Sequence, residues 1–346
     1  MQSFRCPVCA QLLFFDNSSC LQCGSELGFD VGGRELVALR RDDDADGILR
    51  RSDGSPGSYR RCANQLEARC NWVLPADESA LLCRSCRLTS VRPNDSDADA
   101  MAAFAHAEAA KRRLIDQVLA LGLPLLDRTD EPERGVTFEL LSSRGRSVTT
   151  GHQAGVITLD LSESDDAHRE FVRLQLGEQY RTVLGHLRHE IGHYFWPLLV
   201  VEGGAVDEFR TLFGDERQSY QEALDRHYLT GPGSEWPSTH VSQYATMHPW
   251  EDWAETFAHY LHICDGLETA SEFGIEVGDP SRAAGERAWP SVTTESTDDL
   301  VRRWLTLTLA LNAMSRSIGE SDLYPFVLSP AVVEKLDFVR RVSSPG

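Results

Sequence analysis

Residues 184–196, LGHLRHEIGHYFW, contain a His-Glu-x-x-His pattern inside a segment with the apolar spacing of a buried helix. On a helix, residues four apart share one face, so His189 and His193 present two imidazoles side by side, and Glu190 follows the first of them. A buried helix does not readily enclose two histidines and a glutamate that lack partners. The pattern therefore predicts that His189 and His193 bind a zinc ion and that Glu190 reaches the water on that metal. The alternative is a pair of ordinary surface or core histidines.

A catalytic zinc needs a third protein ligand, and a second helical segment supplies the candidates. Residues 248–261, HPWEDWAETFAHYL, combine a proline suited to a helix start with an apolar stripe at helical spacing. We expect Glu251 to bind the metal and Glu255, one turn further, to hydrogen-bond a ligating imidazole. Asp252 is rotated by about 100° and is disfavoured as a ligand. The alternatives are that Glu255 is the ligand, or that both glutamates lie on a solvated acidic face.

Eight of the nine cysteines lie in the first 86 residues, and six of these form Cys-x-x-Cys pairs. In a chain without an export signal, such pairs favour tetrahedral zinc thiolate sites over disulfides. Two sites are predicted, the first from Cys6, Cys9, Cys20 and Cys23 and the second from Cys62, Cys70, Cys83 and Cys86. We expect both to be structural, because a short segment with little apolar content needs metal to fold. A recognition or redox role is the alternative.

The remaining sequence predicts an α+β fold in two domains. We assign residues 1–96 to a Cys-rich module and residues 97–346 to a mostly helical domain with a small sheet. Within the module, residues 28–61 are rich in Gly, Asp, Ser and Arg, which indicates a partly flexible connection with one strand at 35–39. For the second domain we expect a bridging helix over 97–121, strands at 138–141 and 156–161, and helical segments near 166–197, 206–229, 249–265, 298–317 and 329–341.

Charge and hydropathy limit the possible partners of the chain. Its 346 residues carry 34 basic and 53 acidic side chains, and the net charge of −19 disfavours nucleic acid and anionic membranes. No stretch approaches the roughly 18–20 apolar residues of a membrane span. The start, MQSFRCPVCAQLLFF, lacks the form of a secretion signal. We therefore expect a cytoplasmic monomer without nucleic-acid or membrane partners.

These motifs carry a family resemblance. HEIGH followed by Glu251-x-x-Ala-Glu255-x-Phe resembles the gluzincin metallopeptidases, and SQYATMHPWEDWAETFAHYL is similar to the corresponding helix of the anthrax lethal factor catalytic domain. The chain as a whole, including its Cys-rich start and LFGDERQSYQEAL, resembles the bacterial putative zinc-binding metallopeptidases with an N-terminal zinc-ribbon region. The resemblance implies a zincin-like domain, one catalytic and two structural zinc ions, and a peptide or protein substrate.

The resemblance also assigns roles to individual side chains. A tyrosine seven residues before the third ligand assists catalysis in lethal factor, and Tyr244 has that offset from Glu251. Zinc held by His189, His193 and Glu251 would activate a water and polarise the scissile carbonyl. Glu190 would act as general base, and Tyr244 would stabilise the developing oxyanion. The alternative for Tyr244 is an ordinary loop tyrosine.

The predicted strand at 156–161 is expected to offer an exposed edge along which a substrate adds as a further strand. Two rival functions stay open. The zincin domain could bind a peptide or protein partner without significant hydrolysis, with the ribbons as an interaction platform, or it could hydrolyse an amide that is not a peptide. The presence of Glu190 beside the ligands favours an enzyme, because a binding module needs no general base.

Overall fold

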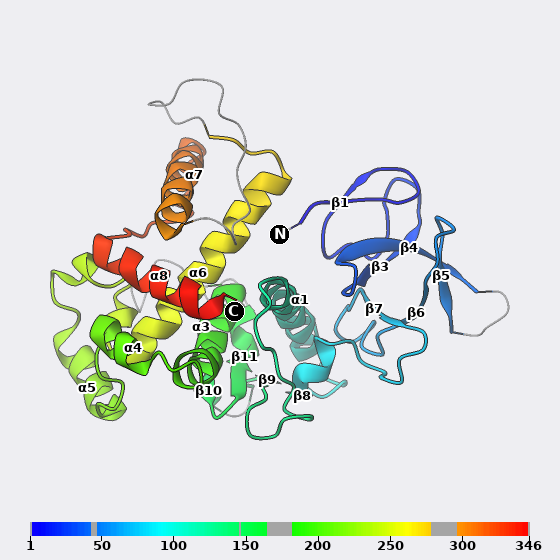
Figure 1. Cartoon of the computed structure of the whole chain (residues 1–346). Coiled ribbons are helices and arrows are strands. Elements are labelled where there is room, and N and C mark those ends of the chain that lie inside the picture. Colours follow the sequence, from blue (N-terminus) through cyan, green and yellow to red (C-terminus); the bar gives the residue numbers. More distant parts are fainter. Residues whose placement is uncertain (1, 43–46, 145–146, 165–181, 278–295, 345–346) are drawn as a thin grey trace. The chain divides into compact units, whose positions relative to one another are not determined.

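The structure, a computed structural model, describes residues 2–42, 47–144, 147–164, 182–277 and 296–344. Within these residues the chain forms seven α-helices, two small sheets and a closed β-barrel, so the predicted α+β class is confirmed (Figure 1). The chain packs into two compact units. The first comprises 1–116, 126–151 and 155–166, and the second comprises 117–125, 152–154 and 167–346. The domain boundary at residues 96/97 stays a prediction.

The first unit begins with a Cys-rich hairpin followed by a small barrel. Strands β1 (Phe4–Arg5) and β2 (Leu12–Leu13) form the hairpin. The barrel consists of β3 (Glu26–Asp30), β4 (Glu35–Arg41), β5 (Leu49–Arg51), β6 (Ser58–Arg61) and β7 (Trp72–Pro75). Neighbouring strands pair antiparallel, and parallel pairing of β3 with β7 closes the barrel. Its core consists of Val37, Leu39, Leu49, Tyr59 and Val73.

The flexible connection predicted for residues 28–61 is wrong. That range contains most of β3 and all of β4 to β6, and the single strand expected at 35–39 is only one of them. The strands are short, and arginines stand directly beside their buried apolar side chains, so composition hides them. Gly28 is needed for closure, because a Cβ atom there would lie 2.5 Å from Cγ1 of Val73 and 2.9 Å from Cδ1 of Leu39.

A four-stranded sheet has the order β10 (Gly151–Gln153), β11 (Val156–Asp160), β9 (Thr137–Leu141) and β8 (Thr89–Val91). The strands expected at 138–141 and 156–161 are present as β9 and β11, which pair in parallel. The expectation that 156–161 offers a free edge is wrong, because β11 lies between β10 and β9. The alternation of side chains reveals which face of a strand is buried, but it does not reveal the neighbours of that strand.

Helices dominate the rest of the described chain: α1 (Ala98–Ala120), α3 (Val183–Phe195), α4 (Val206–Phe213), α5 (Tyr220–Thr230), α6 (Pro249–Glu272), α7 (Thr297–Ser317) and α8 (Pro330–Ser343). A π-helical turn, Trp196–Val201, continues α3. The single segment expected at 206–229 is two helices, because Gly214 ends α4 with a φ of 101°. Of the segment expected at 166–197, residues 166–181 lie outside the described residues.

Helix α6 is the centre of the second unit. It packs against α3, α7 and α8, and its apolar face, including Trp253 and Phe257, is fully buried against rings such as those of Phe195, Phe209 and Phe338. This packing sets α3 and α6 side by side, and these are the two helices that carry the predicted zinc ligands.

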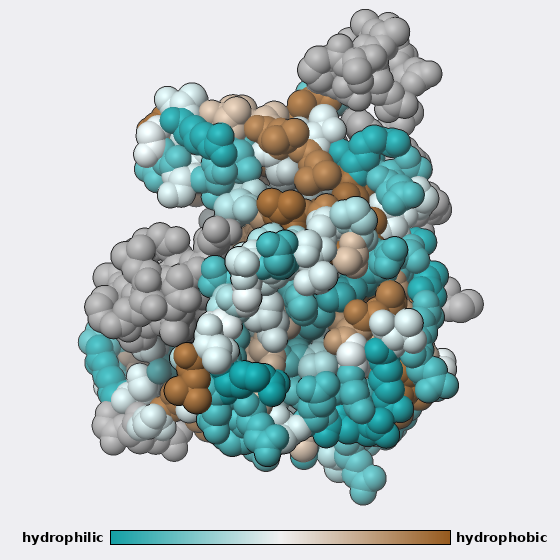
Figure 2. Space-filling model, turned by 90° about the vertical axis from the view of Figure 1, so that its left-hand side faces the viewer, coloured by the Kyte–Doolittle hydropathy of each residue, from teal (hydrophilic) through white to brown (hydrophobic). Residues whose placement is uncertain are grey.

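The surface of the described chain is mainly polar. Figure 2 shows one face on which hydrophobic side chains gather in the upper part among hydrophilic ones. Exposed large apolar residues in the second unit include Leu309 and Met314 of α7 and Ile318 directly after it, so the apolar surface of α7 is not confined to its buried face. No helix in the described ranges is long and apolar enough to cross a membrane.

Candidate metal centres

Close packing of α3 on α6 brings the predicted zinc ligands together. Gly192 permits this approach, because a Cβ atom there would lie only 3.2 Å from Cα of Ala254. The indole of Trp253 donates to the Gly192 carbonyl oxygen at 2.8 Å and fixes the contact. Helix α6 begins at Pro249, and the ring of His248 caps it by accepting from the Trp250 amide. The histidines of α3 thus face the first two turns of α6.

Three ligand atoms at this contact fit one tetrahedral zinc ion. The Nε2 atom of His189 lies 3.1 Å from Nε2 of His193 and 3.0 Å from Oε2 of Glu251, and the remaining pair is 3.3 Å apart. Ligands at about 2.0–2.1 Å around a tetrahedral zinc lie roughly 3.3 Å from one another. All three side chains are buried. The set of two imidazoles and one carboxylate leaves a fourth position for a water or a substrate.

Glu255 lies behind this group and binds the first histidine. Its Oε1 atom is 2.7 Å from Nδ1 of His189, and its Oε2 atom accepts from the hydroxyl of Ser242 at 2.6 Å. Burial raises the pKa of Glu255, but the hydrogen bond to His189, the charge of that ring and the hydrogen bond from Ser242 together outweigh it and lower this pKa to about 2. The structure therefore brings Glu251 to both imidazoles and Glu255 to the far side of one, which favours Glu251 over Glu255 as the third ligand.

Glu251 and Glu190 differ in their electrostatic environment. Burial raises the pKa of Glu251, but the nearby imidazoles of His193 and His189 outweigh it and hold this pKa below its ordinary value. Burial raises the pKa of Glu190, and its Oε2 atom has no hydrogen-bond partner among the described residues. Glu251 is thus ionised, the form that binds metal, whereas Glu190 is a buried carboxyl with an acceptor atom still open.

Asp252, which was disfavoured as a ligand, points into a different environment. It is fully buried, and its Oδ2 atom accepts from Nζ of Lys335 at 2.6 Å. The same oxygen atom lies 3.7 Å from Nε2 of His240, which is not one of the proposed metal ligands. Asp252 therefore anchors α8 to α6 and is not part of the group of ligand atoms.

Two tyrosines approach the site, and sequence reasoning named only one of them. Tyr244 lies in a single 3₁₀ turn, Tyr244–Thr246, with its ring centroid 5.8 Å from that of His189. Tyr220, the first residue of α5, donates its hydroxyl to Oε1 of Glu251 at 3.0 Å. Nothing in its spacing marks Tyr220, because it is 31 residues from Glu251 and only tertiary packing joins the two.

His152 and Trp250 flank His193 and were not predicted either. The His152 ring, on β10, stacks on that of His193 at 6.0 Å, and the Trp250 ring lies 4.6 Å from it. Burial lowers the pKa of His152 to about 4, so this imidazole is neutral at pH 7. Strand β10 is only Gly-His-Gln, too short to show a pattern in the sequence.

The cysteines gather into the two predicted groups of four. In the first, Sγ atoms of Cys6 and Cys23 are 3.7 Å apart and those of Cys9 and Cys20 are 3.6 Å apart. In the second, the Cys70 and Cys83 sulfurs are also 3.6 Å apart. These separations match roughly 3.8 Å between thiolates around one zinc and far exceed the about 2.05 Å of a disulfide. The remaining cysteine, Cys264, is buried in α6.

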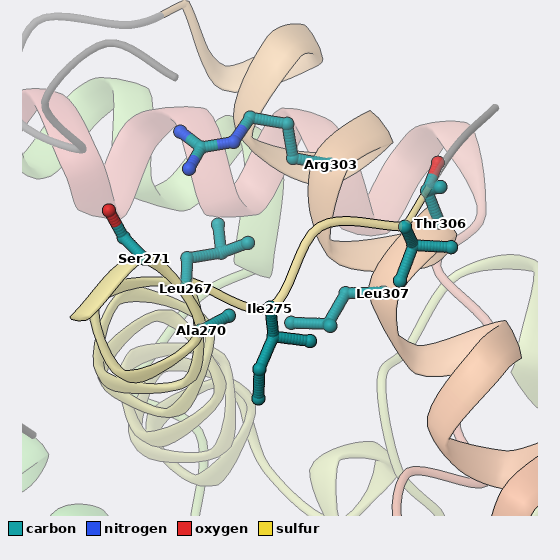
Figure 3. Close-up of a pocket in the computed structure, with 8 residues that line it drawn as sticks. Leu267, Ala270, Ser271, Ile275, Arg303, Thr306 and Leu307 are labelled. Atoms are coloured by element: carbon teal, nitrogen blue, oxygen red, sulfur yellow. The ribbon is translucent and has the colours of Figure 1, made fainter. Parts of the chain in front are cut away.

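A pocket in the second unit lies between the C-terminal end of α6 and α7 (Figure 3). Leu267, Ile275 and Leu307 give it an apolar lining, and Arg303 is its charged side chain. It includes none of the candidate metal ligands, so it does not belong to the His/Glu centre.

Comparison with known proteins finds two families that match the chain. Residues 100–342 match the protein family described as "Putative zinc-binding metallo-peptidase", and residues 3–97 match a zinc-ribbon domain family. Similar curated relatives are uncharacterised proteins of Mycobacterium tuberculosis and Mycobacterium bovis. Each is 48% identical over 343 residues, which cover 99% of this chain and 95% of the relative. No solved structure matches the chain significantly.

Proposed function

The chain belongs to the family described as "Putative zinc-binding metallo-peptidase", and from this premise we propose that it is a zinc-dependent hydrolase of peptide bonds. One observation carries the proposal. Ligand atoms of His189, His193 and Glu251 lie within 3.3 Å of one another, and Glu190, a buried carboxyl with an open acceptor, follows the first histidine. A metal site that served only for structure would need no such carboxyl.

In this proposal His189, His193 and Glu251 hold the catalytic zinc, and the eight paired cysteines hold two structural ions. When bound, a catalytic zinc lowers the pKa of water and polarises a carbonyl group. When zinc is bound, Glu255 would accept from Nδ1–H of His189, which would leave Nε2 of that ring free to bind the ion.

The protein's own groups then move the protons. Glu190 takes a proton from the attacking water, because burial raises its pKa above that of an exposed carboxyl and makes it a stronger base. It passes this proton to the nitrogen of the leaving amine. Burial raises the pKa of Tyr244, so this side chain stays protonated and can donate to the carbonyl oxygen as negative charge develops there.

Zinc counting tests the metal assignment. We expect elemental analysis of the purified chain to give three equivalents in the wild type and two in His189→Ala. If both proteins carry two, the HEIGH segment holds no metal and the proposal fails at its first step. If the wild type carries two and His189→Ala carries one, one of the two groups of four cysteines holds no zinc.

Glu190→Gln tests the chemistry. We expect it to keep all three zinc ions and to lower the hydrolysis rate of an unstructured protein substrate by about 10²–10⁴, the usual contribution of a general base. Asp225→Asn, an exposed acidic residue of α5, is the matched control and should leave the rate unchanged. Turnover that survives in Glu190→Gln would contradict the assigned base.

A further inference from the structure

The third metal ligand has two carboxylate oxygens, and the structure gives each a different partner. Oε2 of Glu251 faces the Nε2 atoms of His189 and His193, whereas Oε1 accepts from the hydroxyl of Tyr220 at 3.0 Å. We propose that Tyr220 is a positioning residue that holds Glu251 in the orientation in which a single oxygen is offered to the metal. This inference rests on the proposed function, because it assumes that Glu251 is a ligand.

The carboxylate needs such a partner. The terminal torsion of a glutamate has a broad, roughly two-fold preference, so rotation alone does not select one oxygen for the metal. Glu251 is 3% exposed, so water has little access to its second oxygen. A buried acceptor without a donor is unfavourable, and the tyrosine hydroxyl is the donor that the structure provides. Without it, Oε1 would compete with Oε2 for the position facing the imidazoles.

Tyr220 is itself held in place by the start of α5 and the start of α6. The hydroxyl of Ser219 caps α5 by accepting from the Glu222 amide. The Tyr220 ring packs against that of His248 at 5.4 Å, and His248 donates from Nε2 to the Gln218 carbonyl oxygen. Because His248 also caps α6, one residue links the helix that carries Tyr220 to the helix that carries Glu251. The hydrogen bond therefore joins two prearranged groups.

Tyr244 lies beside the same group of ligand atoms but does not take the place of Tyr220. Its ring centroid is 5.8 Å from that of His189, whereas the hydroxyl that donates to Glu251 belongs to Tyr220. Tyr244 should therefore affect metal binding less than Tyr220.

Tyr220→Phe in the full chain tests the proposal, with Tyr228→Phe as control, since Tyr228 lies on the same helix and is 69% exposed. We would measure zinc release to a chromophoric chelator. The zinc of the His/Glu site is the equivalent that the wild type releases and that His189→Ala does not contain. Loss of a group that orients a ligand weakens metal binding by about 10–100-fold, and we expect at least about tenfold for Tyr220→Phe. Tyr228→Phe and the cysteine-bound zinc should be unchanged.

Two further measurements separate orientation of the ligand from general damage. Cobalt bound at the His/Glu site should have a different visible absorption spectrum in Tyr220→Phe than in the wild type, because the carboxylate is held differently. Tyr244→Phe should weaken zinc binding by less than Tyr220→Phe, because the hydroxyl that donates to Glu251 is that of Tyr220.

The possible failures are distinguishable. If the wild type holds a third zinc and Tyr220→Phe binds it with unchanged affinity and unchanged cobalt spectrum, the role of Tyr220 is refuted while the proposed function stands. If Tyr244→Phe weakens zinc binding as much as Tyr220→Phe, the hydrogen bond from Tyr220 is not what orients the ligand. If His189→Ala holds as many zinc ions as the wild type, the proposed function and this inference fall together.

Discussion

The cysteine sites and the His/Glu site hold their ligands in opposite ways. The cysteines lie on turns between short strands, and in the first group Cys9 and Cys23 are exposed. The proposed His/Glu ligands lie on α3 and α6, two helices that pack closely at Gly192. All three ligand side chains are buried. Further groups fix these ligands, namely Glu255 on His189 and Tyr220 on Glu251. The difference suggests that metal organises the first region, whereas the fold organises the second.

Both regions nevertheless use the same device beside a ligand. The chain has only two lysines, and both are buried in ion pairs. Lys111 pairs with Glu108, whose other oxygen lies 3.8 Å from Sγ of Cys86. Lys335 pairs with Asp252, the residue after Glu251. Both lysines thus pair with a buried acid that lies beside a proposed metal ligand.

The largest effect should come from removing all zinc with a strong chelator. Structural zinc contributes about 10–16 kcal/mol to the folding of small cysteine-rich domains, so residues 1–91 should lose their strands. The helices of the second unit should persist, because apolar packing around Trp253 and Phe257 holds them. Hydrogen exchange followed by peptide mapping reports on the two regions separately. Equal loss of protection in both regions would break the comparison.

The second largest effect should come from replacing one of the two buried lysines. In Lys335→Met, Asp252 loses the ammonium group that binds its Oδ2 atom, and the Thr239 carbonyl loses its donor. Burial already raises the pKa of Asp252 to about 7 with the lysine present. Breaking a buried pair in this way costs about 3–5 kcal/mol, which denaturant unfolding of the zinc-loaded chain would show.

The same substitution in the first region sharpens the comparison. In Lys111→Met, Glu108 keeps the hydroxyl of Thr89 as a donor at 2.5 Å, so the loss of stability should be smaller than in Lys335→Met. Arg316→Met, which removes an exposed pair with Asp322, should cost about 0–1 kcal/mol and serves as the surface control. If Lys335→Met costs no more than this control, the buried pair does not stabilise α8.

Local spacing allowed the ligands to be predicted from the sequence, and its limits explain what was missed. Two pairs of residues are four positions apart, His189 with His193 and Glu251 with Glu255. Helix geometry alone places the members of such a pair on one face. Tyr220, Ser242 and His152 come from other segments and reach the site only when the chain packs. No spacing rule connects them to a ligand.

The fold shows the same limit. The α+β class and most helices follow from apolar periodicity, whereas the barrel consists of strands of three to seven residues that mix a few apolar side chains with arginines and other polar residues. The position of β11 inside its sheet depends on β10, which has three residues and no apolar pattern. The break between α4 and α5 depends on the positive φ of Gly214, which a smooth periodicity across 206–229 conceals.

Acid should weaken the second unit through two buried histidines. Burial lowers the pKa of His259 to about 4 and that of His262 to about 3, from an ordinary 6.5. Between pH 6.5 and about pH 4 the unfolded chain binds protons at these histidines and the folded chain does not. Their contribution to the stability of the folded state is therefore fully present above about pH 6.5 and is lost as the pH drops towards 4. At pH 5, about 1.5 units below the ordinary pKa, we expect a loss of about 2 kcal/mol from each histidine and about 4 kcal/mol from the two. Residues 1–96 contain no histidine.

Variants locate the source of this acid sensitivity. His262→Leu should make the stability of the zinc-loaded chain depend less steeply on pH, because one of the two protons is no longer taken up on unfolding. His106→Gln, at an exposed position of α1, should leave the dependence unchanged. An unaltered pH profile in His262→Leu would assign the acid sensitivity to other groups.

The smallest effect concerns the outermost member of the His/Glu site. Ser242 donates to Oε2 of Glu255 at 2.6 Å, and Glu255 binds His189 through its other oxygen. Ser242 acts on the metal only through Glu255 and His189, so Ser242→Ala should weaken zinc binding by less than Glu255→Gln. We expect a loss of about 1 kcal/mol, the usual contribution of one hydrogen bond. Chelator competition on the two variants gives the order. If the alanine variant loses as much zinc as Glu255→Gln, the serine is essential to the orientation of His189, and the fold prearranges this site less than the packing of α3 on α6 implies.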